Sequence, residues 1–393
     1  MQVNTKNKKL NIAMICDPIG ESKAGVILST VRFAKLLTAR GHKVIFVGAK
    51  TKGNRKHGIY EGIKTYRFRS LPIPKSGGWS LAFPTVRELK NLFKDEKIDV
   101  VHLILPMSGS VVAIKAAKAL KIKIVAHSHS QPENLFMEMP KIIRPTLFKI
   151  WNSYLVWTYS KTETLIYPSK LASSLLEKYN KKNKKSVVIS NGINIVEYKP
   201  MGIGDFHQRF SIPDDKIKLL FVGRLFPEKS VDTLIEALPH ILEKHPNVHL
   251  MLVGIGHLQS KLEKLAEKFA VRKHITFLGL VSEIDKILAY NASDIFILPS
   301  LAELEGMVVL EAMACGKPII ISDAKNSASR FFVEDNGFLF ETKNGKHLAE
   351  QIMKLVSDKD LREKMGNASL AKSKDYDILK SVEKLEAIYY SVL

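Results

Sequence analysis

Short apolar runs alternate with longer amphipathic stretches along the whole chain, and this alternation limits the fold more than any other feature of the sequence. The runs have the length of buried strands, and the stretches between them have the length and periodicity of helices. Such a pattern is typical of an α/β protein, in which helices connect the strands of a parallel sheet. The predicted strands are residues 11–16, 42–48, 100–105, 123–126, 165–168 and 187–189, then 218–222, 249–253, 275–278, 295–298 and 318–322; the predicted helices include residues 27–38, 110–120, 231–244, 258–269 and 307–314.

The alternation occurs in two series, and these predict two domains. Between them, around residues 197–215, the pattern gives way to Pro, Gly and polar residues, which we interpret as a linker. A chain of 393 residues is also too long for one ordinary hydrophobic core. We therefore expect a first domain at residues 1–197 and a second domain at residues 214–374.

The last residues of the chain, 373–393, have the pattern of a helix. A closing helix ordinarily packs on the domain that precedes it, but this one can equally return to the first domain, and periodicity does not distinguish the two. The predicted apolar face consists of Leu379, Val382, Leu385, Ile388 and Tyr389.

Basic residues are concentrated in the first half of the chain. Residues 1–200 contain 35 Lys and Arg against 12 Asp and Glu, a net charge of +23, whereas residues 201–393 contain 25 against 27, a net charge of −2. A general lysine bias would load both halves alike, so we favour a polyanionic partner for the first domain: anionic lipid, nucleic acid or an acidic substrate. No apolar run approaches the ~20 residues that cross a bilayer, and Cys16 and Cys315 suit a reducing compartment. We expect the protein to stay in the cytoplasm.

The densest candidate site follows the fourth predicted strand of the second domain. Glu303 lies in the loop after this strand, Gly306 begins a helix, and Glu311 lies inside that helix. A helix N-terminus carries about half a positive charge and free N–H groups, so the backbone from Gly306 through Met307 to Val308 is expected to hold a diphosphate. Glu311 would then contact ribose hydroxyls, and Glu303 the hydroxyls of a sugar.

Two basic residues, Arg224 and Lys229, follow the first strand of the second domain. Ligands of open parallel sheets bind at the carboxyl ends of the strands. A diphosphate leaving group gains negative charge as its bond to the sugar breaks, and two cations at this place would stabilise that charge. The alternative is that Arg224 and Lys229 are solvated residues of a loop without a ligand. In the same way, Glu303 can be a carboxylate of a surface loop and Glu311 a residue on the face of a helix.

These residues also carry a resemblance to a known family. The segments VGRLFPEKSVDTLIEA and VISNGINIVEYKP, with the Glu303-x7-Glu311 block, resemble the GT-B glycosyltransferases of family 4, which use nucleotide sugars and retain the anomeric configuration. The resemblance covers nearly the whole chain and is strongest over residues 188–340. It implies two Rossmann-like, doubly wound domains that face each other across a cleft, with the donor bound mainly by the second. It also implies no metal or other cofactor, and a C-terminal helix at residues 375–393 that crosses back and completes the first domain.

The resemblance implies roles for single residues of the second domain. Arg224 and Lys229 would hold the diphosphate. Glu303 would contact the sugar and Glu311 the ribose, while Gly279 would lie near the base.

In the first domain the resemblance implies two site residues. Gly25 matches the glycine loop that approaches the phosphate, and His129 matches the active-site histidine. We interpret His127 as structural, because no third ligand for a metal is evident near this pair. The sequence departs from the family pattern without losing a charge that the chemistry needs, at Ala24, Ser230 and Asn194.

Aromatic and basic side chains are interleaved between Phe136 and Tyr159, our candidate for the acceptor side. This composition is typical of a helix that lies in a membrane interface, although a core helix with an aromatic face is also consistent with it. The charge of the first domain favours the membrane, and so does the resemblance, since several family 4 enzymes glycosylate diacylglycerol or phosphatidylinositol. The basic residues are Lys141, Arg144 and Lys149, and the segment includes Trp151 and Trp157.

We therefore predict a retaining hexosyltransferase, peripheral on the inner face of the cell membrane, that transfers a hexose from UDP-glucose to a lipid acceptor such as diacylglycerol. One alternative is a transferase for a soluble or undecaprenyl-linked glycan. Another is a nucleotide-sugar epimerase or a phosphorylase with the same architecture. A basic nucleic-acid-binding protein would leave Glu303 and Glu311 unexplained and lacks a recognised motif, so no nucleic-acid partner is expected.

Overall fold

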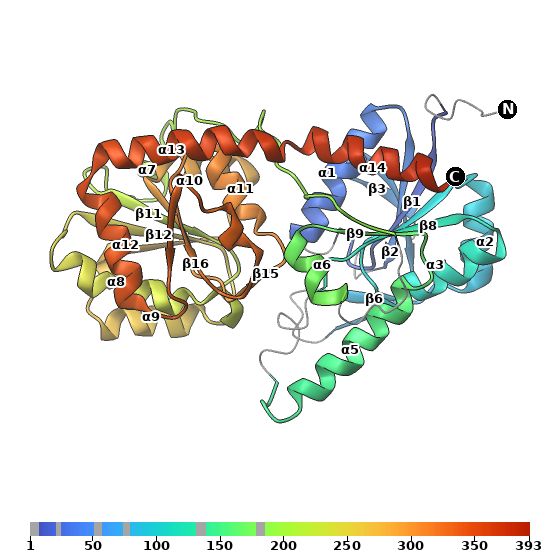
Figure 1. Ribbon diagram of the computed structural model, residues 1–393, viewed down its shortest axis with the longest axis horizontal. Helices are drawn as coiled ribbons and strands as arrows, with labels where there is room; N and C mark the ends of the chain where they lie inside the picture. Colours follow the sequence, from blue (N-terminus) through green and yellow to red (C-terminus); the bar gives the residue numbers. More distant parts are fainter. Residues whose placement is uncertain (1–7, 21–24, 51–56, 74–78, 131–138, 178–184) are drawn as a thin grey trace. The chain divides into compact units, whose positions relative to one another are not determined.

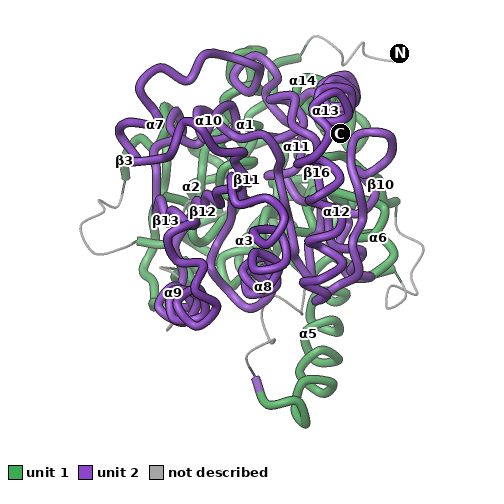
Figure 2. The backbone as a smooth tube through the Cα atoms, turned by 90° about the vertical axis from the view of Figure 1, so that its left-hand side faces the viewer, with its two compact units in different colours: residues 1–132, 140–191, 378–393 green, residues 133–139, 192–377 purple. Residues whose placement is uncertain are grey.

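The computed structural model describes residues 8–20, 25–50, 57–73, 79–130, 139–177 and 185–393 and shows an α/β chain (Figure 1). The chain divides into two compact units, which Figure 2 draws in different colours. Unit 1 comprises residues 1–132, 140–191 and 378–393, and unit 2 comprises residues 133–139 and 192–377. The stretch expected to be a linker, residues 197–215, belongs to unit 2, where it buries Tyr198, Phe206 and Ile212.

The main strands of unit 1 are β1 (Asn11–Ile15), β2 (Lys43–Ala49), β3 (His57–Tyr60), β4 (Ile63–Phe68), β7 (Val100–Leu103), β8 (Lys123–His127), β9 (Thr164–Tyr167) and β10 (Ser186–Val188). Within the described residues they form one sheet in the order β10-β9-β8-β7-β1-β2-β4-β3, and only the pair of β3 with β4 is antiparallel. Val and Ile fill the inner strands because helices cover both faces of such a sheet. A separate antiparallel pair consists of β5 (Ser70–Pro72) and β6 (Ser80–Ala82).

The helices of unit 1 are α1 (Gly25–Ala39), α2 (Val86–Asp95), α3 (Ser108–Ala119), α5 (Arg144–Tyr159), α6 (Lys170–Glu177) and α14 (Ile378–Val392). Although α14 follows unit 2 in the sequence, it packs beside α1 in unit 1 (Figure 1). Its carboxylate Glu386 pairs with Arg40 at 2.6 Å. The predicted apolar face was wrong at one position, because Leu379 is exposed and the neighbouring Ile378 is buried in its place.

The strands of unit 2 are β11 (Ile217–Val222), β12 (Val248–Val253), β13 (Ile275–Gly279), β14 (Ile295–Leu298), β16 (Ile319–Ser322) and β18 (Gly337–Phe340). In the part of the chain that is described they form an all-parallel sheet in the order β13-β12-β11-β14-β16-β18, the doubly wound Rossmann order. Leu220 in β11 lies opposite Met251 on one side and Phe296 on the other. A short parallel pair, β15 (Ala302–Glu303) with β17 (Asn326–Ser327), lies outside this sheet.

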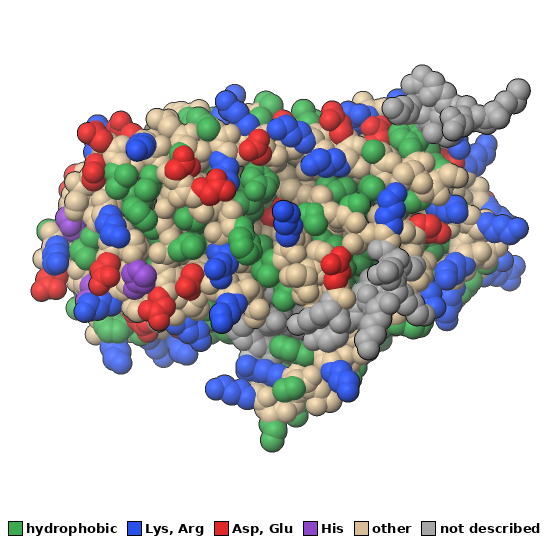
Figure 3. Space-filling view, viewed as in Figure 1, with side chains coloured by type: hydrophobic (Ala, Val, Ile, Leu, Met, Phe, Trp, Pro, Cys, Tyr) green, Lys and Arg blue, Asp and Glu red, His purple; other side chains and the backbone are tan. Residues whose placement is uncertain are grey.

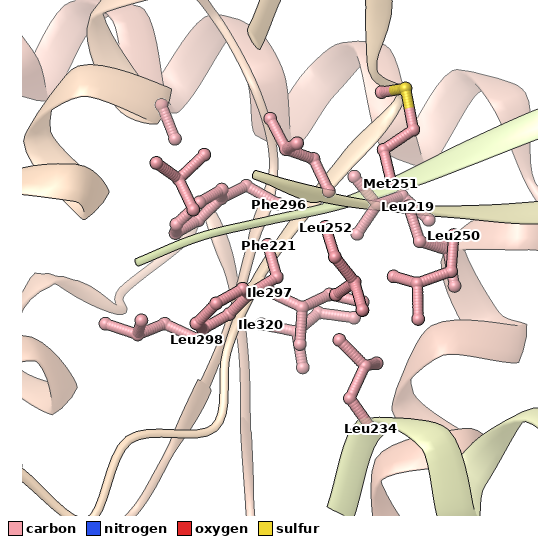
Figure 4. Close-up of a cluster of buried hydrophobic side chains, with 14 of the residues drawn as sticks. Leu219, Phe221, Leu234, Leu250, Met251, Leu252, Phe296, Ile297, Leu298 and Ile320 are labelled. Atoms are coloured by element: carbon pink, nitrogen blue, oxygen red, sulfur yellow. The ribbon is translucent and has the colours of Figure 1, made fainter. Parts of the chain in front are cut away.

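The helices of unit 2 are α7 (Phe206–Arg209), α8 (Val231–Leu242), α9 (Gln259–Lys268), α10 (Glu283–Ala292), α11 (Met307–Ala314), α12 (Gly345–Ser357) and α13 (Lys359–Ser373). Helices α8, α9 and α12 lie on one face of the sheet, and α10, α11 and α13 lie on the other (Figure 1). Side chains of the central strands interdigitate with those of the helices, as Figure 4 shows for Phe221, Ile297 and Leu234. This packing fixes the ends of the strands, where the candidate site lies.

The predicted strands, and the helices predicted at residues 27–38, 110–120, 231–244, 258–269 and 307–314, occur within two residues of their expected bounds, and α11 has the bounds that were predicted. The closing helix, expected at residues 375–393, begins three residues later, at Ile378. The sequence patterns missed β3, β4 and β18, and also the short strands β5, β6, β15 and β17. β3 lies at the edge of its sheet and is largely exposed, and β4 carries Lys64, Tyr66 and Arg67, so neither has the apolar run of an inner strand.

Candidate active site

The strand order of unit 2 reverses between β11 and β14, and ligands of doubly wound sheets bind beyond the carboxyl ends of the strands at such a point. Arg224 follows β11, and Glu303 follows β14. Gly279 ends β13, and its carbonyl accepts a hydrogen bond of 2.9 Å from the N–H of Gly254, just after β12. The predicted residues Arg224, Glu303 and Gly279 therefore belong to one edge of one sheet.

Lys229 and Glu303 form an ion pair at this edge. Lys229 ends a short 3₁₀ helix (Pro227–Lys229), and its ammonium donates to Glu303 Oε1. Both side chains are 13% exposed. The loops that carry them are also joined through the backbone, because the N–H of Leu301 donates to the carbonyl of Glu228 at 2.8 Å. The structure thus brings together two predicted site residues that are far apart in the sequence.

Arg224 is held by a carboxylate that the sequence patterns did not identify. Its Nη2 donates to Glu228 Oε1 at 2.7 Å, and Glu228 is buried. The guanidinium also lies over the ring of Phe226, with 4.7 Å between Cζ and the ring centroid. These contacts orient Arg224, whose own side chain remains half-exposed. Glu228 directly precedes Lys229 in the sequence, but nothing in that position distinguishes a buried partner from a surface residue.

Helix α11 begins at the same edge of the sheet, and its first residues carry no side-chain cap. Gly306 precedes it with φ of 96°, a left-handed conformation that favours glycine. A Cβ at this position would also lie 2.0 Å from Ser329 Oγ. Glycine is therefore required for the turn that starts the helix at Met307. Uncapped N–H groups at a helix N-terminus favour an anionic ligand.

Glu311 lies inside α11 and is buried against α10. Tyr290 donates its hydroxyl to Glu311 Oε2 at 2.9 Å, and Lys286 Nζ lies 3.1 Å from Oε1. Burial, together with the neighbouring carboxylate, holds the pKa of Tyr290 well above its ordinary value, so this hydroxyl keeps its proton and can donate it. Sequence reasoning did not find Lys286 or Tyr290, because the contact joins two helices whose order in the fold is not encoded in local periodicity.

In unit 1, the predicted site residue His129 belongs to a stack of three imidazoles. The ring of His127 lies between those of His129 and His102, with centroid separations of 4.8 and 5.3 Å. Tyr389 of α14 bonds to His102 Nδ1 at 2.7 Å. Burial lowers the pKa of His129 to about 4 and that of His102 to about 3, so both imidazoles are neutral at pH 7. His127 is buried.

Gly25 is the first residue of α1 in unit 1, whereas its expected neighbour Ala24 lies outside the described residues. A residue that sequence reasoning missed, Asp17, follows β1 close by in the chain. Its Oδ2 accepts hydrogen bonds from the N–H groups of Ala82 and Gly109, at 2.9 and 3.1 Å. Burial raises the pKa of Asp17 to about 6. The sequence did contain a signal for Asp17, because a carboxyl group just after the first strand lies at the edge of the sheet where ligands bind.

Helix α5 contains most of the segment that was predicted to contact a membrane, and it extends away from the sheet of unit 1 (Figure 1). Its buried residues are confined to the second half of the helix and include Leu155 and Tyr159. Ile150 is 62% exposed and Trp157 is 47% exposed, and Ile142, just before the helix, is 87% exposed. Figure 3 shows α5 at the bottom, with Lys and Arg beside hydrophobic side chains. Phe136 lies outside the described residues.

Among the described residues, no group of three or more His, Cys, Asp or Glu side chains is arranged to hold a metal ion. In that same part of the chain, no helix is long and apolar enough to span a bilayer. Cys16 and Cys315 are both buried, and no disulfide joins them.

Two family models match the chain, one in each half. The model described as Glycosyltransferase Family 4 matches residues 24–197, and the model described as Glycosyl transferases group 1 matches residues 203–372. An uncharacterized glycosyltransferase of Methanocaldococcus jannaschii is 28% identical over 87% of this chain and 88% of its own length. The alpha-monoglucosyldiacylglycerol synthase of Streptococcus pneumoniae is 26% identical over 79% of this chain and 70% of its own length.

The fold also matches solved structures of two-domain glycosyltransferases. The crystal structure of Anabaena HepE in complex with UDP and glucose superposes with a TM-score of 0.79, at 20% identity, over 97% of this chain and 100% of that chain. This likeness shows the GT-B fold, with two Rossmann-like domains, and confirms the fold class predicted from the sequence.

Proposed function

We propose that this chain, which belongs to the family 4 glycosyltransferases and has the GT-B fold, transfers glucose from UDP-glucose to a membrane lipid such as diacylglycerol, with retention of configuration. The observation that carries the proposal is the Lys229–Glu303 pair at the switch point of unit 2, on the edge where α11 begins. It combines a cation for a diphosphate with a carboxylate for sugar hydroxyls. UDP-glucose is the proposed donor because a similar structure contains UDP and glucose.

The proposed chemistry uses groups of this chain in fixed positions. The acceptor hydroxyl attacks the anomeric carbon on the face that the diphosphate leaves, and the departing oxygen accepts the proton of that hydroxyl. Lys229 and Arg224, with the N–H groups at the start of α11, stabilise the charge that develops on the diphosphate. Glu303 accepts hydrogen bonds from the sugar and Glu311 from the ribose. No metal takes part in this scheme.

His129 is the residue of unit 1 that we propose contacts the reacting groups. Because its imidazole is neutral at pH 7, it donates or accepts hydrogen bonds there without adding a charge. The ring of His129 packs on the buried ring of His127, which supports it from the core of unit 1.

A lipid acceptor is supported by the exposed part of α5. Ile142, Ile150 and Trp157 present apolar side chains to solvent, and the exposed Lys141 and Lys149 lie among them. Basic side chains near an anionic bilayer contribute about 1 kcal/mol each, and an apolar side chain that enters the interface adds a contribution that does not depend on salt. We propose that these exposed side chains of α5, together with Ile142 just before it, rest on the inner face of the cell membrane. A similar enzyme from Streptococcus pneumoniae bears the name of a monoglucosyldiacylglycerol synthase.

An activity screen tests the proposed donor and acceptor. Purified protein is incubated with UDP-glucose, UDP-galactose, UDP-N-acetylglucosamine or GDP-mannose and with vesicles that contain diacylglycerol and either phosphatidylglycerol or phosphatidylcholine. Mass spectrometry of the extracted lipid identifies the product. We expect glucosyl-diacylglycerol, formed fastest in the anionic vesicles. Transfer to a water-soluble glycan with no lipid product would contradict the lipid acceptor and leave the glycosyltransferase assignment intact.

Vesicle sedimentation tests the docking of α5. Replacing Ile142, Ile150 and Trp157 together by Ser should abolish binding to anionic vesicles while the circular dichroism spectrum stays unchanged, because none of the three is buried. Reversing the charge of Lys141 and Lys149 to Glu should weaken binding most at low salt. The matched control reverses two exposed lysines of unit 2, Lys261→Glu and Lys264→Glu, and should bind like the wild type. Equal binding by all variants would refute the docking surface.

A further inference from the structure

The carboxylate of Glu311 is held on both oxygens by one neighbouring helix. Lys286 and Tyr290 are four residues apart in α10, so they project from the same face of that helix. Lys286 Nζ lies 3.1 Å from Oε1 of Glu311, and the Tyr290 hydroxyl donates to Oε2 at 2.9 Å. Glu311 is 2% exposed, and an ion pair is the usual way to make the burial of such a charge tolerable.

Lys286 is itself fixed by its surroundings. Its ammonium lies 3.2 Å from Glu283 Oε1 and 5.5 Å from the centroid of the Tyr198 ring. Tyr198 is buried and donates its hydroxyl to the same carboxylate, that of Glu283. The lysine side chain is only 13% exposed. The ammonium is thus confined between two carboxylates and an aromatic face, so it constrains Glu311 strongly.

We propose that Lys286 and Tyr290 are positioning residues, which orient the Glu311 carboxylate toward the two neighbouring hydroxyls of the donor ribose. This inference rests on the proposed function, in which Glu311 contacts the ribose. An ionised carboxylate offers about four acceptor positions on its two oxygens. Lys286 contacts Oε1 and Tyr290 donates to Oε2, so each of the two oxygens is held by a donor from α10. A carboxylate fixed in this way is matched to a vicinal diol.

A purely structural role for the two residues has a different consequence. If they only stabilise the contact between α10 and α11, their replacement lowers the stability of unit 2 and weakens the binding of every nucleotide to the same extent. If they orient Glu311, their replacement weakens the binding of a ribonucleotide more than the binding of its 2′-deoxy counterpart, because only the ribonucleotide has the hydroxyl contact that is lost. The ratio of the two dissociation constants therefore separates positioning from packing.

Calorimetric titration of the full chain measures this ratio without any acceptor. UDP, GDP, ADP and CDP are tested first, and the one that binds most tightly is compared with its 2′-deoxy form. For the wild type we expect the deoxy form to bind about tenfold more weakly, the effect of one hydrogen bond to a charged group. Lys286→Met and Tyr290→Phe should each weaken the binding of the ribonucleotide and bring the ratio of the two dissociation constants close to one. Lys286→Arg, which keeps the charge, should preserve most of the discrimination.

The matched control is Lys354→Met in α12. Lys354 also combines a hydrogen bond, 2.9 Å to Gln351, with a position 5.0 Å from the centroid of an aromatic ring, that of Phe338. It touches none of the proposed donor residues, so this variant should keep the wild-type affinity and the wild-type ratio.

Three outcomes would overturn the inference, and they are distinguishable from one another. If none of the four diphosphates binds the wild type, the nucleotide donor of the proposed function fails and the positioning role fails with it. If the wild type binds a ribonucleotide and its deoxy form equally, Glu311 does not contact the 2′-hydroxyl. If the wild type discriminates and the Lys286→Met variant discriminates to the same extent, the lysine is structural. Should Lys286→Met fail to fold, Tyr290→Phe decides, since it removes one hydroxyl.

Discussion

Replacing Lys229 with Met tests the centre of the candidate site, because it removes a charge with little change in side-chain volume. In the wild type the ammonium pairs with Glu303, and each side chain is 13% exposed. Exposed ion pairs contribute up to about 1 kcal/mol, and breaking a fully buried pair costs about 3–5 kcal/mol. For this intermediate burial we expect a loss of about 2 kcal/mol, which lowers the Tm of a unit of this size by about 4–8 °C.

The effect on catalysis should be larger and should have a separate origin. If Lys229 stabilises the charge on the departing diphosphate, its loss lowers kcat about 10²- to 10³-fold, the usual cost of removing one such group. Two further variants separate this from lost stability: Glu303→Gln alone, and Glu303→Gln combined with Lys229→Met. The double variant contains no unpaired carboxylate, so its Tm should return toward the wild-type value.

The assay is kcat at saturating donor, measured by release of UDP, beside a thermal melt of each variant. We expect the double variant to regain stability without regaining activity. Recovery of kcat in parallel with Tm would refute the reasoning, because it would show that Lys229 serves only to neutralise Glu303.

Glu311→Gln should raise the KM for the donor about 10- to 100-fold, because a hydrogen bond to a charged acceptor is weakened; an unchanged KM for every active nucleotide sugar would remove Glu311 from the site. Dialysis against EDTA should leave kcat unchanged, since the proposed mechanism uses cations of the chain itself, and activity that is lost and then restored by Mg²⁺ would contradict this. Asp17→Asn should remove the part of the pH dependence of the free energy of unfolding that comes from the titration of Asp17. Burial raises the pKa of Asp17 from 3.8 to about 6 in the folded protein, so the stability from this group is complete below the lower value and is lost as pH rises through the upper one. Relative to the wild type, the variant should therefore gain about 2–3 kcal/mol in free energy of unfolding between pH 4 and pH 7, measured with denaturant, and parallel pH profiles would disprove the assignment.

Inner strands and helices were predictable because their patterns are local. A strand that is buried on both faces needs a continuous apolar run, as in Ile295–Leu298, and a helix start at a left-handed glycine is visible as Gly306 followed by apolar residues. Edge strands such as β3 lack this signal, since solvent replaces one neighbour. The apolar face of α14 was placed one residue too late at its start, because Ile378 and Leu379 are both apolar and only packing on unit 1 distinguishes them.

The roles of the site residues remain predictions, and their partners were beyond local patterns. Lys229 and Glu303 are 74 residues apart, and Lys286 and Glu311 are 25 apart, yet each pair is in contact. Glu228 and Glu303 have the same residue type, but one orients Arg224 from a buried position and the other pairs with Lys229. Burial and pairing of this kind depend on which strands and helices are neighbours.

The sequence by itself determined the α/β class, the two series of strands and helices, and the positions of charged residues at the ends of particular strands, because each of these depends on residues close together in the chain. Only the tertiary structure decided that β11 lies beside β14, and hence that Lys229 meets Glu303. It also decided that α14 returns to unit 1 and that α10 supports Glu311. The physical reason is that strand order and helix packing are selected by burial of the whole apolar surface, which no single periodic segment encodes.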